Sequence, residues 1–232
     1  MTSNNLITRA VLALAATLVP LAAEGAISRA VSFDEKVGNA ASVIVGKCLR
    51  TEARWDPSGR FILTYATFQV ERALKGQPTS QMTVVVPGGK VGNVYQDSAG
   101  IPSFEAGDER VLFIRDSSVG PTVAFFDQGT YDLVRDARGE RMVRPVFSEA
   151  VYVDTQRGVA VPAESPRPLR QFERDIRDAE ARHAKNRMAV LEKQKQKKEQ
   201  ESSLRAGLQR NKLLVLLALA GAVLATWQYL RR

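Results

Sequence analysis

The sequence predicts a mainly β domain, either a small antiparallel barrel of the OB type or a sandwich, followed by a long α-helical stalk and a C-terminal transmembrane helix. Three features support this fold class. Short runs rich in Val, Ile, Phe, Tyr and Thr recur between Ser42 and Val153. A charged, helix-forming stretch covers residues 169–212, and an uncharged apolar stretch runs from Leu213 to Leu230.

The N-terminal residues 1–26 have the pattern of a secretory signal peptide. An apolar run from Ala10 to Ala23 follows Arg9, and small residues come directly after it. This run is too short to cross a bilayer as a helix. We therefore expect cleavage between Ala23 and Ala26, which predicts that the rest of the chain lies outside the cytoplasm.

The predicted β domain covers residues 27–160, which is enough chain for one domain with a sizeable core. Clusters of Gly, Pro, Asp and Ser separate its strand-like runs, as turns do. Short strands with almost no helix between them are typical of antiparallel barrels and sandwiches. The predicted strands are Ser42 to Leu49, Phe61 to Ala73, Gln81 to Val86, Arg110 to Arg115, Thr122 to Phe126, Thr130 to Arg135 and Met142 to Phe147.

A short helix is predicted over Ser32 to Asn39, because Ser32 is followed by Glu35 as in a capping box. The single cysteine, Cys48, lies in the first predicted strand, so we expect a buried, inert thiol and no disulfide within the chain. Alternation along the strands predicts one buried face. The residues expected on that face are Val43, Val45, Phe68, Val70, Val84, Val111, Phe113 and Tyr131.

The C-terminal third predicts a linker, a stalk and an anchor. Three prolines mark a linker over residues 161–168, and residues 169–212 are predicted to form a basic helical stalk whose capacity to form a coiled coil is left open. As a helix, the anchor at residues 213–230 would measure about 27 Å, close to the roughly 30 Å of a bilayer core. Residues 231–232 would then form a cytoplasmic tip, and the expected location is the bacterial cell envelope, as a single-pass membrane protein.

The net charge of +8 is unevenly distributed along the chain. Residues 27–166 carry sixteen basic and seventeen acidic residues, whereas residues 167–212 carry fourteen and seven. The basic excess therefore lies in the stalk and not on the β domain. This distribution argues against a nucleic-acid partner, which would require a basic patch on the folded domain.

Several motifs within residues 34–136 resemble those of a known group of proteins. They include Val70 to Gly76, Val84 to Gly89, Gly100 to Phe104 and Gly107 to Ile114. In these motifs the chain resembles an uncharacterised family of exported bacterial β domains, which occur alone or beside matrixin-type metalloprotease modules and have no assigned activity. The resemblance therefore implies an exported β domain, and no particular chemistry.

A weaker likeness, carried by the valine-rich first strand and the Leu74-Lys75-Gly76 motif, is to the OB-type barrels of netrins and tissue inhibitors of metalloproteinases. Those inhibitors place an N-terminal, disulfide-bonded cysteine on the zinc of their target. Cys48 lies inside a predicted strand, so this mechanism does not transfer to the present chain.

No catalytic, metal or cofactor site is predicted. The single histidine, His183, lies in the stalk, so the β domain cannot build a His-dependent catalytic pair or a His-containing zinc site. Two weaker alternatives remain. A carboxylate pair could come from Asp97, Glu105, Asp108 and Glu109, and a calcium site could come from Asp127, Asp132 and Asp136.

The predicted recognition surface is a loop of about seventeen residues, from Gly88 to Phe104, because loops of that length in compact domains are usually functional or disordered. Its candidate binding residues are Lys90, Tyr95, Asp97 and Phe104. An alternative surface, expected on the opposite rim, comprises Arg54, Trp55 and Asp56.

These features favour a membrane-tethered, extracytoplasmic binding module without catalytic activity. Its predicted contacts are the bilayer, through Leu213 to Leu230, and an envelope protein or polymer. The alternatives are a regulator of an exported protease, acting as inhibitor or scaffold, and an enzyme that uses a carboxylate pair.

Overall fold

The computed structural model describes residues 26–148, 150–210 and 212–231. The chain divides into two compact units, residues 1–174 and residues 175–232. Apart from Ala26, the predicted signal peptide lies outside the described residues, so its cleavage stays a prediction.

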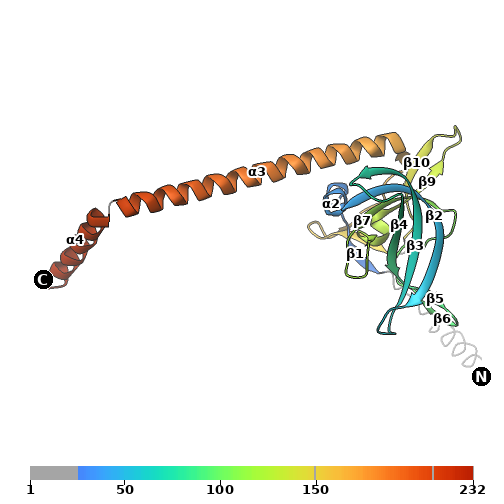
Figure 1. Cartoon of the computed structure of the whole chain (residues 1–232), viewed down its shortest axis with the longest axis horizontal. Helices are drawn as coiled ribbons and strands as arrows, with labels where there is room; N and C mark the ends of the chain where they lie inside the picture. Colours follow the sequence, from blue (N-terminus) through green and yellow to red (C-terminus); the bar gives the residue numbers. More distant parts are fainter. Residues whose placement is uncertain (1–25, 149, 211, 232) are drawn as a thin grey trace, which may run out of the picture. The chain divides into compact units, whose positions relative to one another are not determined.

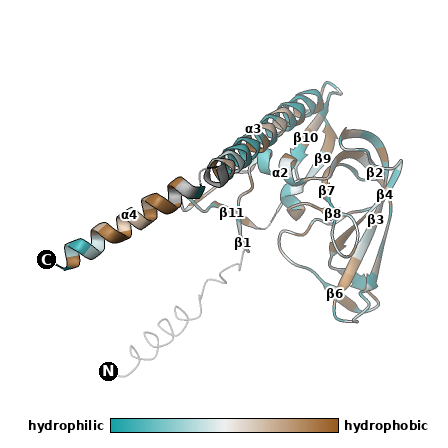
Figure 2. Cartoon of the chain, turned by 60° about the vertical axis from the view of Figure 1, so that its left-hand side comes forward, coloured by the Kyte–Doolittle hydropathy of each residue, from teal (hydrophilic) through white to brown (hydrophobic). Residues whose placement is uncertain are grey.

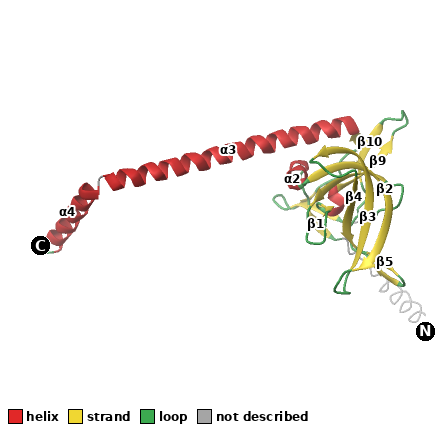
Figure 3. Cartoon of the chain, viewed as in Figure 1, coloured by secondary structure: helices red, strands yellow, loops and turns green. Residues whose placement is uncertain are grey.

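The first unit is rich in β-strands, as the sequence predicts (Figure 3). Its strands are β1 (Ile27–Arg29), β2 (Ser42–Trp55), β3 (Ile62–Lys75), β4 (Gln81–Pro87), β5 (Gly89–Val91), β6 (Val94–Gln96), β7 (Glu109–Arg115), β8 (Thr122–Val123), β9 (Thr130–Arg135), β10 (Arg141–Pro145), β11 (Val151–Asp154), β12 (Val159–Ala160) and β13 (Arg167–Pro168). The helices of the described residues are α2 (Phe33–Asn39), the 3-10 helix η1 (Phe126–Gly129), α3 (Leu169–Arg210) and α4 (Lys212–Leu230).

The main sheet is antiparallel and has the strand order β13-β10-β9-β7-β2-β3-β4, with β8 paired to β7. The β2–β3 pair carries three register shifts, and bulges of this kind bend strands. The sheet is strongly curled (Figure 1), and β4 contacts β8. The Val85 amide donates to the Pro121 carbonyl at 2.8 Å, and the Thr122 hydroxyl donates to the Val85 carbonyl at 2.7 Å. The β-rich part of the predicted fold is thus confirmed, and the curl is closer to a small barrel than to a sandwich.

Both faces of the sheet are buried at its centre, which differs from the one-sided burial predicted from the sequence. Val43, Ile44 and Val45 are consecutive on β2, and each is at most 1% exposed. Ile44 pairs with Leu112 and belongs to one hydrophobic cluster, together with Phe68 and Val84. Val43 pairs with Phe113 and therefore points to the other face.

An aromatic cluster covers that second face and ties two helices to the sheet. Phe113 on β7 makes ring contacts with Phe33, Tyr131 and Phe172 at centroid distances of 5.8 to 6.0 Å. Phe33 begins α2, and Phe172 lies in the first turns of α3. Seven of the eight predicted core residues are buried, whereas Val70 is partly buried beside the first cluster. The predicted core residues thus divide between two faces.

Helix α2 and Cys48 follow their predictions. The Ser32 side chain caps α2 by accepting a hydrogen bond from the Glu35 amide at 3.2 Å. Cys48 is 1% exposed, and burial raises the pKa of its thiol. A buried thiol with a raised pKa carries little of the thiolate that a reactive cysteine needs.

Helix α3 begins at the residue predicted for the stalk, and its surface is largely hydrophilic along its length (Figure 2). Its first residues, 169–174, nevertheless belong to the β-rich unit. The predicted linker before it is also part of that unit, because β13 pairs with β10 and the Val161 amide donates to the Tyr152 carbonyl at 2.8 Å.

The prediction of a transmembrane anchor is wrong. Within residues 26–148, 150–210 and 212–231, no helix combines the length and the apolar character needed to cross a membrane. The prediction depended on Leu213 to Leu230, whose helical length of about 27 Å is slightly less than the roughly 30 Å of a bilayer core. Three other predictions depended on this anchor and are withdrawn with it. They are the bilayer contact, the cytoplasmic tip and the location as a single-pass envelope protein.

Candidate functional site

The predicted recognition loop contains a β-hairpin. Strands β5 and β6 pair in register, with Lys90 opposite Tyr95, around a two-residue turn of Gly92 and Asn93. Tyr95 is 67% exposed, and its hydroxyl donates to the Asp97 carboxylate at 3.0 Å. Three of the four predicted binding residues therefore lie at or next to one hairpin.

Phe104, the fourth predicted residue, belongs to the core and not to a binding surface. It is 6% exposed, and its ring meets Phe68 edge-on at a centroid distance of 5.3 Å. An apolar residue at the end of a loop can anchor that loop by packing inward, and the sequence does not distinguish this role from recognition.

The two predicted recognition surfaces are neighbours, so their expected placement on opposite rims is wrong. The Gln96 side chain on β6 accepts a hydrogen bond from the Ile62 amide at 2.6 Å and donates to the Arg60 carbonyl at 3.2 Å. The Gly88 amide donates to the Ile62 carbonyl at 2.8 Å. These bonds fasten the β5–β6 hairpin to the turn between β2 and β3. In Figure 1 β5 and β6 lie beside one end of β2 and β3, which both contact β5.

Gly89 allows this close approach. Its φ of +127° is disfavoured for residues with a side chain, and a Cβ there would overlap Thr64 Oγ1 and lie 3.0 Å from Ala53 Cβ. The hairpin therefore lies directly on the ends of β2 and β3.

Asp56 organises the turn between β2 and β3. Its carboxylate accepts hydrogen bonds from the amides of Ser58, Arg60 and Phe61 and from the Ser58 hydroxyl. These donors lower the pKa of Asp56 to about 2, with the Ser58 hydroxyl contributing most. Asp56 thus has a structural role in shaping the turn.

Large apolar side chains remain exposed on these two hairpins. Phe61 is 58% exposed and Trp55 is 38% exposed. Nearby, the Arg54 guanidinium lies 3.8 Å from the centroid of the Tyr65 ring, a cation–π contact. We call this region the tip surface, which comprises Arg54, Trp55, Phe61, Lys90, Val94 and Tyr95.

The acidic residues considered for catalysis or calcium binding have other partners. Asp108 accepts from the Glu105 amide and pairs with Arg110, and Glu109 lies 3.7 Å from Arg141. Asp132 pairs with Arg110 and Arg144, whereas Asp136 shapes a turn by accepting from the amides of Arg138 and Glu140. In the part of the chain that the structure describes, no group of three acidic, His or Cys side chains could hold a metal ion.

A cleft of about 760 Å³ lies elsewhere on the β-rich unit, and no pattern in the sequence indicates it. Its walls are mostly apolar and come from segments that are distant in sequence. The polar groups in the cleft belong to Lys36, Asp127, Gln128, Tyr131, Asp132, Arg144, Ser148, Tyr152 and Glu164. Its volume lies in the range of small-molecule sites.

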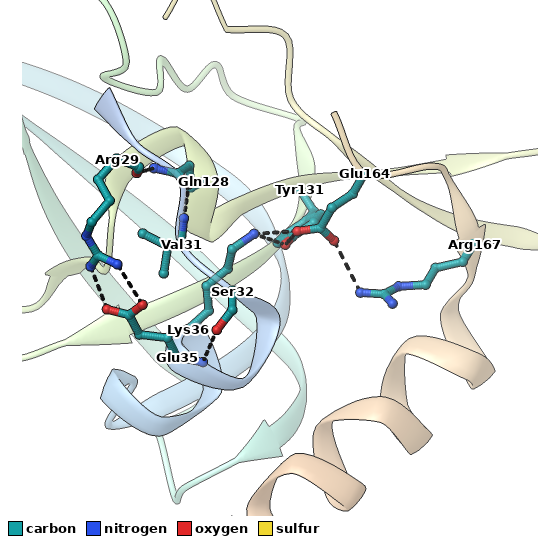
Figure 4. A network of polar contacts seen from close by, with 9 residues as sticks. All are labelled: Arg29, Val31, Ser32, Glu35, Lys36, Gln128, Tyr131, Glu164 and Arg167. Carbon is teal, nitrogen blue, oxygen red and sulfur yellow. Dashed lines mark hydrogen bonds and ion pairs between the residues drawn. The ribbon is translucent and has the colours of Figure 1, made fainter. Parts of the chain in front are cut away.

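One end of the cleft holds a buried charged network (Figure 4). The Lys36 side chain is 5% exposed, and its ammonium donates to the Tyr131 hydroxyl at 2.8 Å and to the Glu164 carboxylate at 2.5 Å. Arg167 adds a second cation at 3.3 Å from Glu164. Burial lowers the pKa of Lys36, which the Glu164 carboxylate opposes, and burial raises the pKa of Tyr131.

A second hydrogen-bonded chain involves Asp127. Tyr152 donates its hydroxyl proton to the Asp127 carboxylate and accepts one from Ser148 at 2.9 Å. Phe125 and Phe126, just before Asp127, have φ values of +58° and +51°, a conformation that costs bulky residues energy. Strain of this kind clusters at functional sites.

The lowered pKa of Lys36 predicts a pH dependence of stability. An unfolded lysine titrates near pH 10.4. Between the lower folded pKa and that value, the unfolded chain binds more protons at this residue, so the free energy of unfolding should rise with pH. We expect wild-type protein to gain stability relative to Lys36→Met between pH 8 and pH 10, by at most about 1.4 kcal/mol for each unit of pKa lowering.

Urea unfolding of both proteins across this range checks the pH prediction. The unfolded Tyr131 phenol loses its proton from about pH 10, and because the folded pKa is raised, this lowers stability only from there upward. Both proteins contain Tyr131, so its contribution largely cancels in the difference between them. A constant difference between the two proteins would mean that the pKa of Lys36 is not lowered.

In comparisons with family models, with curated proteins and with solved structures, no match to this chain was found. The resemblance to exported bacterial β domains therefore stays a prediction.

Proposed function

We propose that this chain is a protein-binding module whose recognition site is the tip surface. The observation that carries the proposal is the Gln96 side chain, which bonds to the backbone of Arg60 and Ile62 where the β2–β3 turn enters β3 and so unites two separately predicted surfaces. Two hairpins fixed to one another offer a partner a pre-formed surface, which reduces the entropy lost on binding.

The composition of the tip surface supports this function. Trp, Tyr and Arg are the residues most enriched among interface hot spots, and all three occur here. The exposed rings belong to residues on both hairpins, Phe61 on one and Tyr95 on the other. In contrast, the carboxylates considered for catalysis give little support to an enzyme. Asp97 accepts hydrogen bonds from the Tyr95 hydroxyl and the Ser98 amide, and Asp108 and Glu109 lie beside arginines.

Site-specific photo-crosslinking tests the proposal and can itself identify the partner. A photoreactive phenylalanine placed at position 95 should give a discrete cross-linked protein product. The same residue at position 119 is the matched control, because Val119 is exposed (50%) in the turn between β7 and β8, outside the tip surface.

Two substitutions should then weaken the cross-link from position 95. Lys90→Ala and Phe61→Ala each remove part of the tip surface, one from each hairpin, and we expect losses of roughly 1 to 2 kcal/mol in partner binding. Because both side chains are exposed, the melting temperature should change little. Cross-linking that persists in Phe61→Ala would show that the two hairpins do not act as one surface. An equal product from position 119 would overturn the proposal.

A further inference from the structure

We propose that the cleft is a second binding site, and that it takes a small organic cation whose ammonium group contacts Asp127 while its apolar body lies along the cleft walls. This site is separate from the tip surface, because it shares no residue with it. The proposal rests on the cavity, on the surroundings of one buried carboxylate and on the character of the walls.

Asp127 is the least satisfied acid of the cleft. It is only 7% exposed, and the hydrogen bond to its carboxylate comes from the neutral Tyr152 hydroxyl. The other two acids of the cleft each contact two cations: Glu164 contacts Lys36 and Arg167, and Asp132 contacts Arg110 and Arg144. Among the described residues, no cationic group lies within 4 Å of Asp127.

A carboxylate offers about four lone-pair sites, and a buried charge is costly unless it is paired. Lys36 influences Asp127 only from a distance, because its ammonium is already bonded to Tyr131 and Glu164. A ligand ammonium can donate up to three hydrogen bonds, and its positive charge would pair with the Asp127 carboxylate, which has no cationic partner among the described residues. Charge complementarity therefore selects a cation for this position.

The rest of the cleft selects an apolar body of small size. Its walls include Val31, Pro145, Val146, Val151, Val161 and Pro162. A volume of about 760 Å³ accommodates a small molecule. Tyr131 and Tyr152 also line the cleft, and aromatic rings attract organic cations.

The test compares 4-phenylbutylamine with 4-phenylbutan-1-ol by calorimetry on the full chain at neutral pH. The two probes share an apolar body and differ in charge. For ligands of this size we expect dissociation constants in the range of roughly 0.1 to 5 mM for the amine. We expect the alcohol to bind roughly 10- to 100-fold more weakly, because a hydrogen bond to a charged group is stronger than one between neutral groups.

Asp127→Asn should abolish the preference for the amine, since the neutral amide no longer pairs with a cation. Asp116→Asn is the matched control, because it makes the same change at an exposed acid outside the cleft. We expect this control to retain the preference for the amine.

Ala163→Trp gives an independent test that leaves Asp127 unchanged. Ala163 is exposed at the cleft, so a larger side chain there should be tolerated in folding while it occupies the ligand volume. The affinity for both probes should then fall at least about 10-fold, because the new side chain removes most contacts along one wall of the cleft. The proposal would be overturned if wild-type protein did not bind the amine, or bound the amine and the alcohol equally. It would also be overturned if amine binding were unchanged in Asp127→Asn or in Ala163→Trp.

Discussion

Replacing Phe113 with Ala is expected to lower the free energy of unfolding by about 3 to 5 kcal/mol, the usual cost of deleting a buried aromatic side chain. Phe113 is fully buried and makes ring contacts with Phe33, Tyr131 and Phe172. The substitution thus opens a cavity where β7, β9 and two helices converge. Such a loss is a large part of the roughly 5 to 15 kcal/mol that stabilises a typical domain.

Urea unfolding followed by circular dichroism measures this effect, and Phe61→Ala is the matched control. Phe61 carries the same side chain but is 58% exposed, so its removal should cost less than about 1 kcal/mol. A free energy of unfolding that is equal in Phe113→Ala and in the wild type would show that the aromatic cluster is not packed as described.

The sequence predicts the local elements of this chain well, because each depends on short-range chemistry. Strand β9 has the predicted bounds, and the strand-like runs are separated by turns as expected. The Ser32 cap fixes the start of α2. The β5–β6 hairpin, which replaces part of the predicted loop, also has a local signal, since Gly92-Asn93 is a two-residue turn typical of hairpins.

The predictions that failed required information from distant residues. One-sided burial is expected for the strands, but Phe33 and Phe172 pack against Phe113 of β7 on the second face, and Phe172 lies more than fifty residues beyond Phe113 in the chain. The placement of the two recognition surfaces likewise depends on Gln96, whose partners lie more than thirty residues away. Periodicity reports which face of a strand is apolar and carries no information on what covers the other face.

The cleft has no sequence signal for the same reason. Its charged network joins Lys36, Tyr131 and Glu164, which come from a helix, a strand and a segment predicted to be a linker. A lysine on a short amphipathic helix is usually exposed, and nothing in its neighbours along the chain indicates burial. Only the fold brings the three groups together.

This network leads to the second large expected effect. Glu164→Ala should lower the free energy of unfolding by about 2 to 4 kcal/mol, because it leaves the buried Lys36 ammonium without its carboxylate. Removing one partner of a fully buried ion pair costs about 3 to 5 kcal/mol. We place the expected value somewhat lower, since the Glu164 side chain is 35% exposed and water screens part of the interaction.

A double-mutant cycle separates the unpaired charge from lost packing. Lys36→Met replaces the ammonium with an apolar group of similar length, so it should cost less than Glu164→Ala, and Arg167 still pairs with Glu164 in this variant. In the double variant Lys36→Met/Glu164→Ala no buried cation remains, and much of the loss caused by Glu164→Ala should be recovered. Strictly additive losses would instead mean that the two residues contribute independently, and that the Lys36–Glu164 bond does not couple α2 to the segment before α3.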